Sequence, residues 1–106
     1  MLLIIRCTSN QSLRKDIGHD EKILNDHGLT VATTKKKGRP KGWTKLKSTR
    51  GTAGAINLDW NAQERMLTCR VVTRQGNKPH ELLGDFTRYL LVRYRGRIQT
   101  LAVFPG

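Results

Sequence analysis

The sequence predicts an α+β protein in which an antiparallel sheet of about four strands is followed by an amphipathic helix. Two observations lead to this prediction. Apolar and polar residues alternate in four short segments between Leu29 and Val71, as they do along strands with one buried face. From Leu82 to Tyr94 the apolar period changes to three and four residues, which is typical of a helix with one apolar side. A chain of 106 residues has room for one core of this kind.

Residues 1 to 28 are expected to be loosely ordered apart from one short helix. The run from Met1 to Ile5 is apolar, but five residues are too few for a signal sequence or a membrane helix, so we interpret it as a strand or a hydrophobic end. Asp20 suits an N-cap and Gly28 suits a left-handed C-terminal position, which predicts a helix over about residues 20 to 27. Residues 29 to 106 are expected to form the single α+β domain.

The first two strands of the predicted sheet flank a basic loop. Residues 29 to 33 alternate as a strand does, and the same period returns from Trp43 to Thr49. Between them, residues 35 to 42 break regular structure, because Pro40 fixes its own φ and Gly38 adds backbone freedom. The sequence therefore predicts a basic loop between the first two strands.

The remaining elements follow in order. Ile56 to Trp60 and Leu67 to Val71 alternate most clearly, and they predict a hairpin with one buried face. Proline is tolerated in a first helical turn, so a helix is expected to begin near Pro79, and it ends near Gly96. Its apolar side comprises Leu82, Leu83, Phe86, Leu90 and Tyr94. Residues 98 to 104 are apolar enough for a closing strand.

Positive charge is concentrated in one part of the chain. The formal net charge is +12, from 20 Lys and Arg against 8 Asp and Glu. Residues 1 to 29 are formally neutral, whereas residues 30 to 50 hold eight bases and no acid. Such a localised excess attracts phosphate polyanions, so nucleic acid is the expected partner.

The segment KKKGRPKG, Lys35 to Gly42, resembles an AT-hook, the short Gly-Arg-Pro element that lies extended in the minor groove of A·T-rich DNA. Arg39 and Pro40 match the core of that family, and Lys37 stands where the hook normally has a second Arg. The resemblance covers eight residues and implies DNA binding, while a general nucleic-acid loop and a solvated connection stay open as alternatives. The residues expected to bind nucleic acid are Lys35, Lys36, Lys37, Gly38, Arg39, Pro40, Lys41, Trp43, Lys45 and Lys47.

The face of Trp43, Lys45 and Lys47 offers a second way to bind. Bases stack on aromatic side chains and lysines follow phosphates, so this face predicts an RNA-binding or single-strand-binding surface. Alternatively, Trp43 belongs to a core or interface and the lysines keep a sheet edge soluble. Arg70 and Arg74, on the outward side of the predicted hairpin, belong either to an extension of such a surface or, as the favoured interpretation, to a solvated face.

Other chemistry is not expected from this sequence. His80, Glu81 and Asp85 have no nucleophile beside them and suit a helix start, so we expect no enzyme, no small-molecule substrate and no cofactor. The histidines and cysteines lack the short spacings of a metal site. Cys7 and Cys69 are expected to be reduced thiols in a cytoplasmic protein, nucleoid-associated if prokaryotic, that does not enter membranes.

The order of four strands and then a helix is similar to the units of the Whirly and PUR-repeat single-strand-binding families. That resemblance implies a homodimer in which helix 79 to 96 or strand 98 to 104 meets its twin. The sequence thus favours a small DNA-binding regulator or nucleoid-associated factor over two alternatives. These are an RNA-binding or single-strand-binding module and a non-enzymatic interaction or structural protein.

Overall fold

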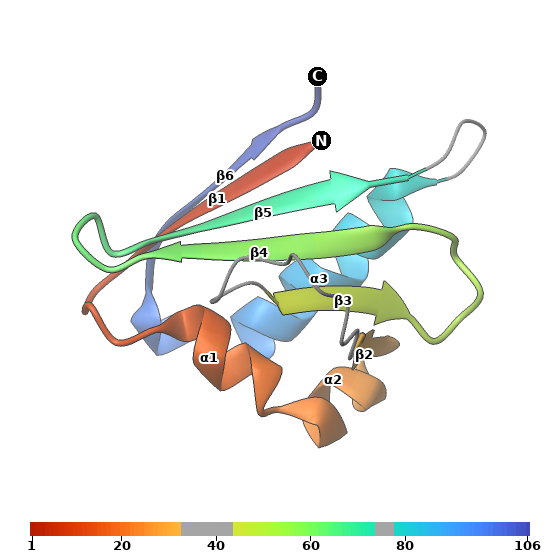
Figure 1. Ribbon diagram of the computed structural model, residues 1–106, viewed down its shortest axis with the longest axis horizontal. Helices are drawn as coiled ribbons and strands as arrows, with labels where there is room; N and C mark the ends of the chain where they lie inside the picture. The colour runs from red at the N-terminus through yellow and green to blue at the C-terminus, as the bar shows by residue number, and fades with distance from the viewer. Residues whose placement is uncertain (33–43, 74–77) are drawn as a thin grey trace, which may run out of the picture.

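The computed structural model describes residues 1–32, 44–73 and 78–106. Within these ranges, six strands and three α-helices form a compact α+β arrangement, which confirms the expected class (Figure 1). The strands are β1 (Leu2–Cys7), β2 (Leu29–Val31), β3 (Thr44–Ser48), β4 (Ala55–Asn61), β5 (Met66–Val72) and β6 (Ile98–Phe104). The helices are α1 (Leu13–Gly18), α2 (Glu21–Asp26) and α3 (Pro79–Arg93), the last followed by a 3₁₀ turn over Arg95–Arg97.

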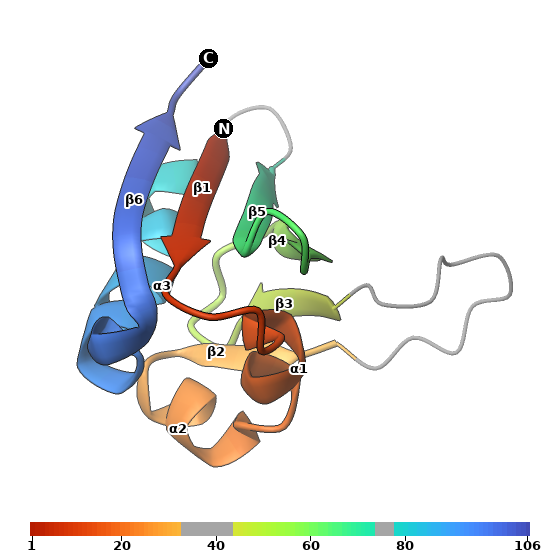
Figure 2. The same ribbon diagram turned by 90° about the vertical axis from the view of Figure 1, so that its left-hand side faces the viewer.

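The strands form one antiparallel sheet in the order β2-β3-β4-β5-β1-β6. Strands β2 to β5 correspond to the four expected strands and β6 to the expected closing strand, while β1 is a sixth strand beyond the expected number. Figure 2 shows the sheet as an arc, with α3 on its inner side and α2 along the outside of β2. The sheet forms an arc because a twisted sheet of six strands curves around the elements packed against one face.

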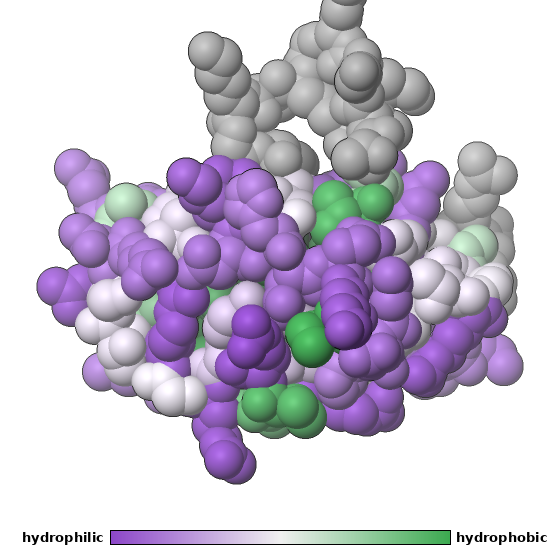
Figure 3. Space-filling model, turned by 90° about the horizontal axis from the view of Figure 1, so that it is seen from below, coloured by the Kyte–Doolittle hydropathy of each residue, from purple (hydrophilic) through white to green (hydrophobic). Residues whose placement is uncertain are grey.

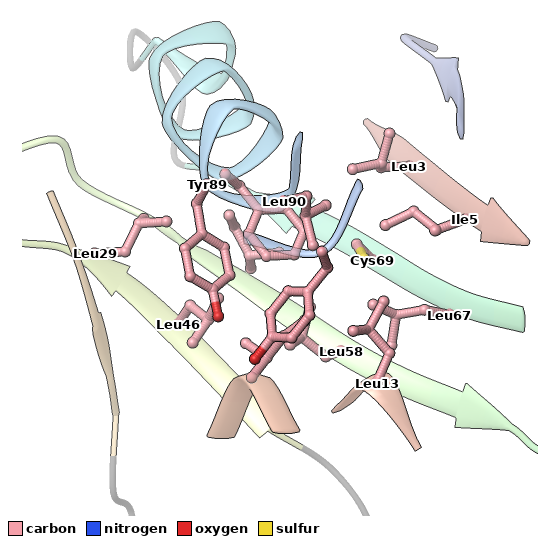
Figure 4. Close-up of a cluster of buried hydrophobic side chains, with 14 of the residues drawn as sticks. Leu3, Ile5, Leu13, Leu29, Leu46, Leu58, Leu67, Cys69, Tyr89 and Leu90 are labelled. Carbon is pink, nitrogen blue, oxygen red and sulfur yellow. The ribbon is translucent and has the colours of Figure 1, made fainter. Parts of the chain in front are cut away.

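The core lies between the inner face of the sheet and the helices (Figure 4). Strand alternation sends every second side chain inward, so Leu3, Leu58 and Cys69 meet across three adjacent strands. From α3, Leu82, Phe86 and Leu90 are fully buried, as predicted. Tyr89 is also fully buried, although it was not expected on the apolar side of the helix.

The expectation of a loosely ordered N-terminal segment is wrong. Strand β1 pairs with β5 on one side and with β6 on the other, so it lies within the sheet rather than beside it. Leu3 and Ile5 are fully buried, and so are Leu13 and Ile17 of α1. The domain therefore begins at the first strand, because without β1 the strand β6 would have no partner in the sheet.

Helix α2 is attached to α3 through one carboxylate. Asp20 occupies the predicted N-cap position of α2, but its side chain makes no capping hydrogen bond. Its Oδ2 instead accepts from the Tyr89 hydroxyl at 2.8 Å, the Tyr94 hydroxyl at 3.3 Å and Arg93 Nε at 3.1 Å. Burial and these contacts raise the pKa of Tyr89 far above its ordinary value, so its hydroxyl stays a donor.

The edge of the sheet at β2 is closed by side chains of α2. The Val31 amide, which points away from β3, donates to Glu21 Oε2 at 2.9 Å, and the Thr30 hydroxyl donates to Glu21 Oε1. The amide nitrogen of Asn25, assigned from its surroundings, donates to the Leu29 carbonyl at 2.8 Å. Gly28 ends α2 with φ of +79°, the left-handed conformation predicted for it.

None of the helices within the described ranges combines the length and the apolar character needed to cross a membrane.

Neighbouring isoleucines of β1 test how far the N-terminal strand supports the fold. Ile5 is fully buried, whereas Ile4 lies on the opposite face and is partly exposed. Ile5→Ala is expected to lower the free energy of unfolding by about 2–5 kcal/mol through lost burial and a cavity. Ile4→Ala should cost about 1 kcal/mol or less. Urea unfolding followed by circular dichroism measures both, and equal small effects would contradict a central role for β1.

Candidate functional site

The structure describes two of the predicted binding residues, Lys45 and Lys47. Lys35 to Lys41 and Trp43 lie outside the described residues, so their arrangement stays a prediction. Lys45 and Lys47 lie on β3, and both side chains project from the sheet face opposite the helices, as the alternation predicted. We call this the outer face.

Cross-strand register brings further polar residues beside the two lysines. Lys45 lies opposite Asn57 of β4, and Asn57 lies opposite Arg70 of β5. Neighbouring strands are about 4.8 Å apart, so the backbones of Lys45 and Arg70 stand about 10 Å from each other. Lys47 and Arg70 are exposed. The outer face thus carries basic side chains on both sides of one asparagine.

Acidic side chains gather on the other side of the molecule. Asp16 pairs with Arg97, Asp20 with Arg93, and Asp85 with both Arg50 and Arg88. The side of the molecule that carries α1 and α2 is mostly hydrophilic, as expected for a surface of charged pairs (Figure 3). Many bases there have their charge offset by a neighbour.

On the outer face the balance differs. Among the residues that the structure describes, Lys47, Arg70 and Arg6 form no ion pair, and Asp59 is the acid whose side chain lies on this face. The outer face thus carries the bases Lys45, Lys47, Arg70 and Arg6 against Asp59, the one acid within the described strands, and such an excess attracts phosphates.

A hollow of about 410 Å³ indents the outer face beside the lysines. It is lined by the small residues Ala53, Gly54 and Ala55 together with Lys45, Lys47, Asn57, Val72 and Thr73. Long side chains around short ones leave this space open. Gly54 is required for the close approach of the β3–β4 connection to β5, since φ is +120° there and an added Cβ would lie 2.5 Å from the Val72 carbonyl oxygen.

The basic segment is attached to the sheet next to this hollow. Val31 lies opposite Leu46, and the Ala32 amide donates to the Lys45 carbonyl at 2.8 Å. Residues 33–43 therefore leave from and return to one end of the β2–β3 pair. Both attachment points adjoin Lys45, which lines the hollow.

A second, polar hollow of about 390 Å³ lies between the β3–β4 connection and α3, and it contains the group considered for acid-base chemistry. Glu81 accepts from the Thr52 hydroxyl at 3.0 Å, and Asp85 pairs with Arg50 and Arg88 at 3.3 and 3.2 Å. These contacts fasten the connection to the helix. Within the described ranges, no cluster of three or more metal-ligating side chains occurs.

Cys7 and Cys69 are free, buried thiols on the inner face of the sheet. Burial raises the pKa of Cys69 well above its ordinary value, and the nearby Cys7 raises it further. Burial also raises the pKa of Cys7, against a lowering by Arg97. Low thiolate content makes both poor nucleophiles and poor metal ligands.

Arg6 and Asn57 belong to the outer face but were not among the predicted binding residues. Arg6 was not predicted because residues 1 to 28 were expected to be loosely ordered. The alternation of Ile5 and Cys7 with Arg6 could have indicated that Arg6 lies on the face opposite the core. Asn57 alternates with Ile56 and Leu58, but its place between Lys45 and Arg70 depends on strand register, which the sequence does not give.

Two glycines with positive φ test the close approach of the β3–β4 connection to β5. Gly54→Ala should lower the free energy of unfolding by about 2–4 kcal/mol, because left-handed strain adds to an overlap with the Val72 carbonyl. Gly51, at φ of +84°, has open space around its Cβ position, so Gly51→Ala should cost only about 1–2 kcal/mol. Thermal unfolding compares them, and equal costs would contradict the close approach at Gly54.

The buried thiols predict a fall in stability at alkaline pH. The unfolded chain loses the Cys69 proton near pH 9.0, whereas the folded chain keeps it because the pKa is raised. The contribution is complete below pH 9 and is lost as pH rises, by at most about 1.4 kcal/mol per pH unit. Denaturant unfolding between pH 8 and 10 measures the slope. Cys69→Ala should make it shallower, and an unchanged slope would contradict the assignment.

Comparisons with protein-family models, with curated proteins and with solved structures gave no match for this chain. The resemblance of Lys35 to Gly42 to an AT-hook therefore stays a prediction from eight residues. The similarity in element order to Whirly and PUR-repeat units likewise stays a prediction. A functional proposal has to rest on the site itself.

Proposed function

We propose that this chain binds nucleic acid without catalysing a reaction, using the outer face of β3 to β5 together with the basic segment at residues 35–43. The observation that carries the proposal is the excess of bases over acids on the outer face. Carboxylates pair with arginines on the helix side, while Lys47 and Arg70 project from the outer face without an ion pair among the described residues. A face of this kind attracts a phosphate backbone.

The position of the basic segment supports the same proposal. Its two ends adjoin Lys45, so bases at 35, 36, 37, 39 and 41 are tethered to the sheet edge nearest the hollow. Tethering raises the local concentration of one binding element near the other. One nucleic-acid strand could then contact both the segment and the outer face.

DNA is the first candidate, through Arg39 and Pro40 in the manner of the Gly-Arg-Pro motif that they resemble. Arg is suited to the narrow minor groove of A·T sequences, where the negative potential is strongest. The lysines on either side would contact flanking phosphates, as would Lys45 and Lys47 on β3.

Single-stranded nucleic acid is the second candidate, and the hollow favours it. The small lining residues Ala53, Gly54 and Ala55 would admit a flat group close to the backbone, and the Asn57 amide, which also lines the hollow, can both donate and accept hydrogen bonds. Trp43 would add a stacking surface. A duplex keeps its bases inside, so only an unpaired strand could use such a hollow.

The outer face can be tested by removing equal charge from two places. Lys47→Ala with Arg70→Ala removes two bases from the outer face, whereas Lys15→Ala with Lys22→Ala removes two exposed bases from α1 and α2. Fluorescence anisotropy with labelled oligonucleotides at 50 and 200 mM salt should show at least about tenfold weaker binding and a shallower salt dependence for the first pair. The second pair should resemble the unmodified chain. Equal losses in both pairs would contradict a localised site.

The kind of nucleic acid is decided with four probes: A·T duplex, G·C duplex, single-stranded DNA and RNA. A preference for A·T duplex that disappears in Arg39→Ala supports the Gly-Arg-Pro segment as the reader. A preference for single strands that is lost in Trp43→Ala supports the outer face. If no probe binds below about 10 µM at moderate salt, a range that even nonspecific binding reaches, the proposal fails. An interaction or structural role without nucleic acid then takes its place.

A further inference from the structure

The two edges of the sheet are finished in different ways. At β2, Glu21 accepts the outward Val31 amide and Asn25 donates to the Leu29 carbonyl, so α2 occupies that edge. At β6, no side chain or backbone group from the described part of the chain takes the corresponding place. An open edge of this kind is a template for another strand.

The backbone groups that face outward on β6 can be identified from the ladder. The Cys7 amide donates toward β5, to the Arg65 carbonyl at 2.7 Å, whereas the Thr8 amide donates toward β6, to the Arg97 carbonyl at 3.0 Å. Antiparallel pairs alternate, so the even-numbered residues of β1 bond to Thr100, Ala102 and Phe104. Leu101 and Val103 therefore direct their amides and carbonyls away from the sheet.

The side chains along this edge also suit a contact. Strand β6 reads IQTLAVF and holds no charged residue. Val103 is 41% exposed and Phe104 is 49% exposed, and together they form an apolar end of the strand. Exposed edges are usually protected by charge or a proline within the strand, whereas here Pro105 follows the last residue of β6.

We propose that β6 is the dimer interface and that its occupant is β6 of a second copy of this chain, paired antiparallel across a two-fold axis. Two features favour a second copy. The outward groups of Leu101 and Val103 are complementary to themselves, since Leu101 of one copy can exchange both hydrogen bonds with Val103 of the other. The chain carries a formal net charge of +12, so two copies repel least where they meet along an uncharged strand.

This proposal is independent of nucleic-acid binding. It would join two six-stranded sheets edge to edge, with both outer faces on the same side. Either proposal can fail while the other holds, because self-association is measured with no oligonucleotide present.

Sedimentation velocity between about 1 and 200 µM tests the dimer with two matched variants. Val103→Lys places a charge at the edge, where the two copies would bring like charges together and weaken association at least about tenfold. Val92→Lys makes the same change on α3, where Val92 is 68% exposed, and should leave association unchanged. A monomer across the whole range overturns the proposal, and so does a Val103→Lys variant that associates as the unmodified chain does.

Amide hydrogen exchange tests the same interface without a substitution. Thr100 and Ala102 bond to β1, so their amides should be protected at every concentration. The amides of Leu101 and Val103 should exchange fast at low concentration and slow by at least about tenfold at high concentration, as the dimer forms. Fast exchange of Leu101 and Val103 at every concentration overturns the proposal, even if Val103→Lys fails to fold.

Discussion

Strand alternation within one sheet decides the chemistry of this molecule. Each strand directs alternate side chains to the core and to the outer face. This alternation buries Leu46 and places Lys45 and Lys47 on the outer face. The same rule on β5 buries Cys69 and exposes Arg70. A shift of one residue in the register of β3 or β5 would bring lysine or arginine into an apolar core, where an unpaired charge is costly. Burial of the core and presentation of the basic face are thus one constraint.

Carboxylates on the helix side hold the helices and the β2 edge in place. Asp20 joins α2 to α3 through Tyr89, Tyr94 and Arg93, and Glu21 closes the β2 edge. Acids used in this way offset part of the positive charge on the helix side, although Lys15 and Lys22 form no ion pair among the described residues. The exposed ion pairs themselves add little stability, typically less than about 1 kcal/mol each. Their larger effect is on where the net charge is found.

Much of the fold could be predicted from local patterns. The period-two runs at β4 and β5, the helix that begins at Pro79 and the closing strand at 98–104 lie where alternation and proline placement indicate. The role of β1 could not be predicted, since an apolar run of five residues gives no sign of its partners, and β5 and β6 are about 60 and 95 residues away in sequence. Asp20 was misjudged for a related reason. A capping position is local, but Tyr89 lies 69 residues from it.

The candidate site shows the same division between local and long-range information. The charge excess of residues 30–50 and the outward direction of Lys45 and Lys47 follow from the sequence alone. The hollow does not, because its lining comes from three strands, β3, β4 and β5, and from residues that flank them. Strand register also aligns one row of residues across the outer face, and the sequence does not predict it. The row runs from Lys45 through Asn57 and Arg70 to Leu2 and Phe104.

That row relates the two proposals in space. It begins with basic and amide side chains at β3 to β5 and ends with apolar ones at β1 and β6, so polarity falls toward the open edge. In a dimer paired through β6 in this way, the two copies of Ala102 would face each other at the two-fold axis, Phe104 of each copy would lie opposite Thr100 of the other, and the basic parts would lie on either side. A long nucleic acid could then contact two sites at once, and the second contact would benefit from the effective concentration set by the first. The open edge at β6 thus has a physical reason to differ from the closed edge at β2, where the basic segment is attached.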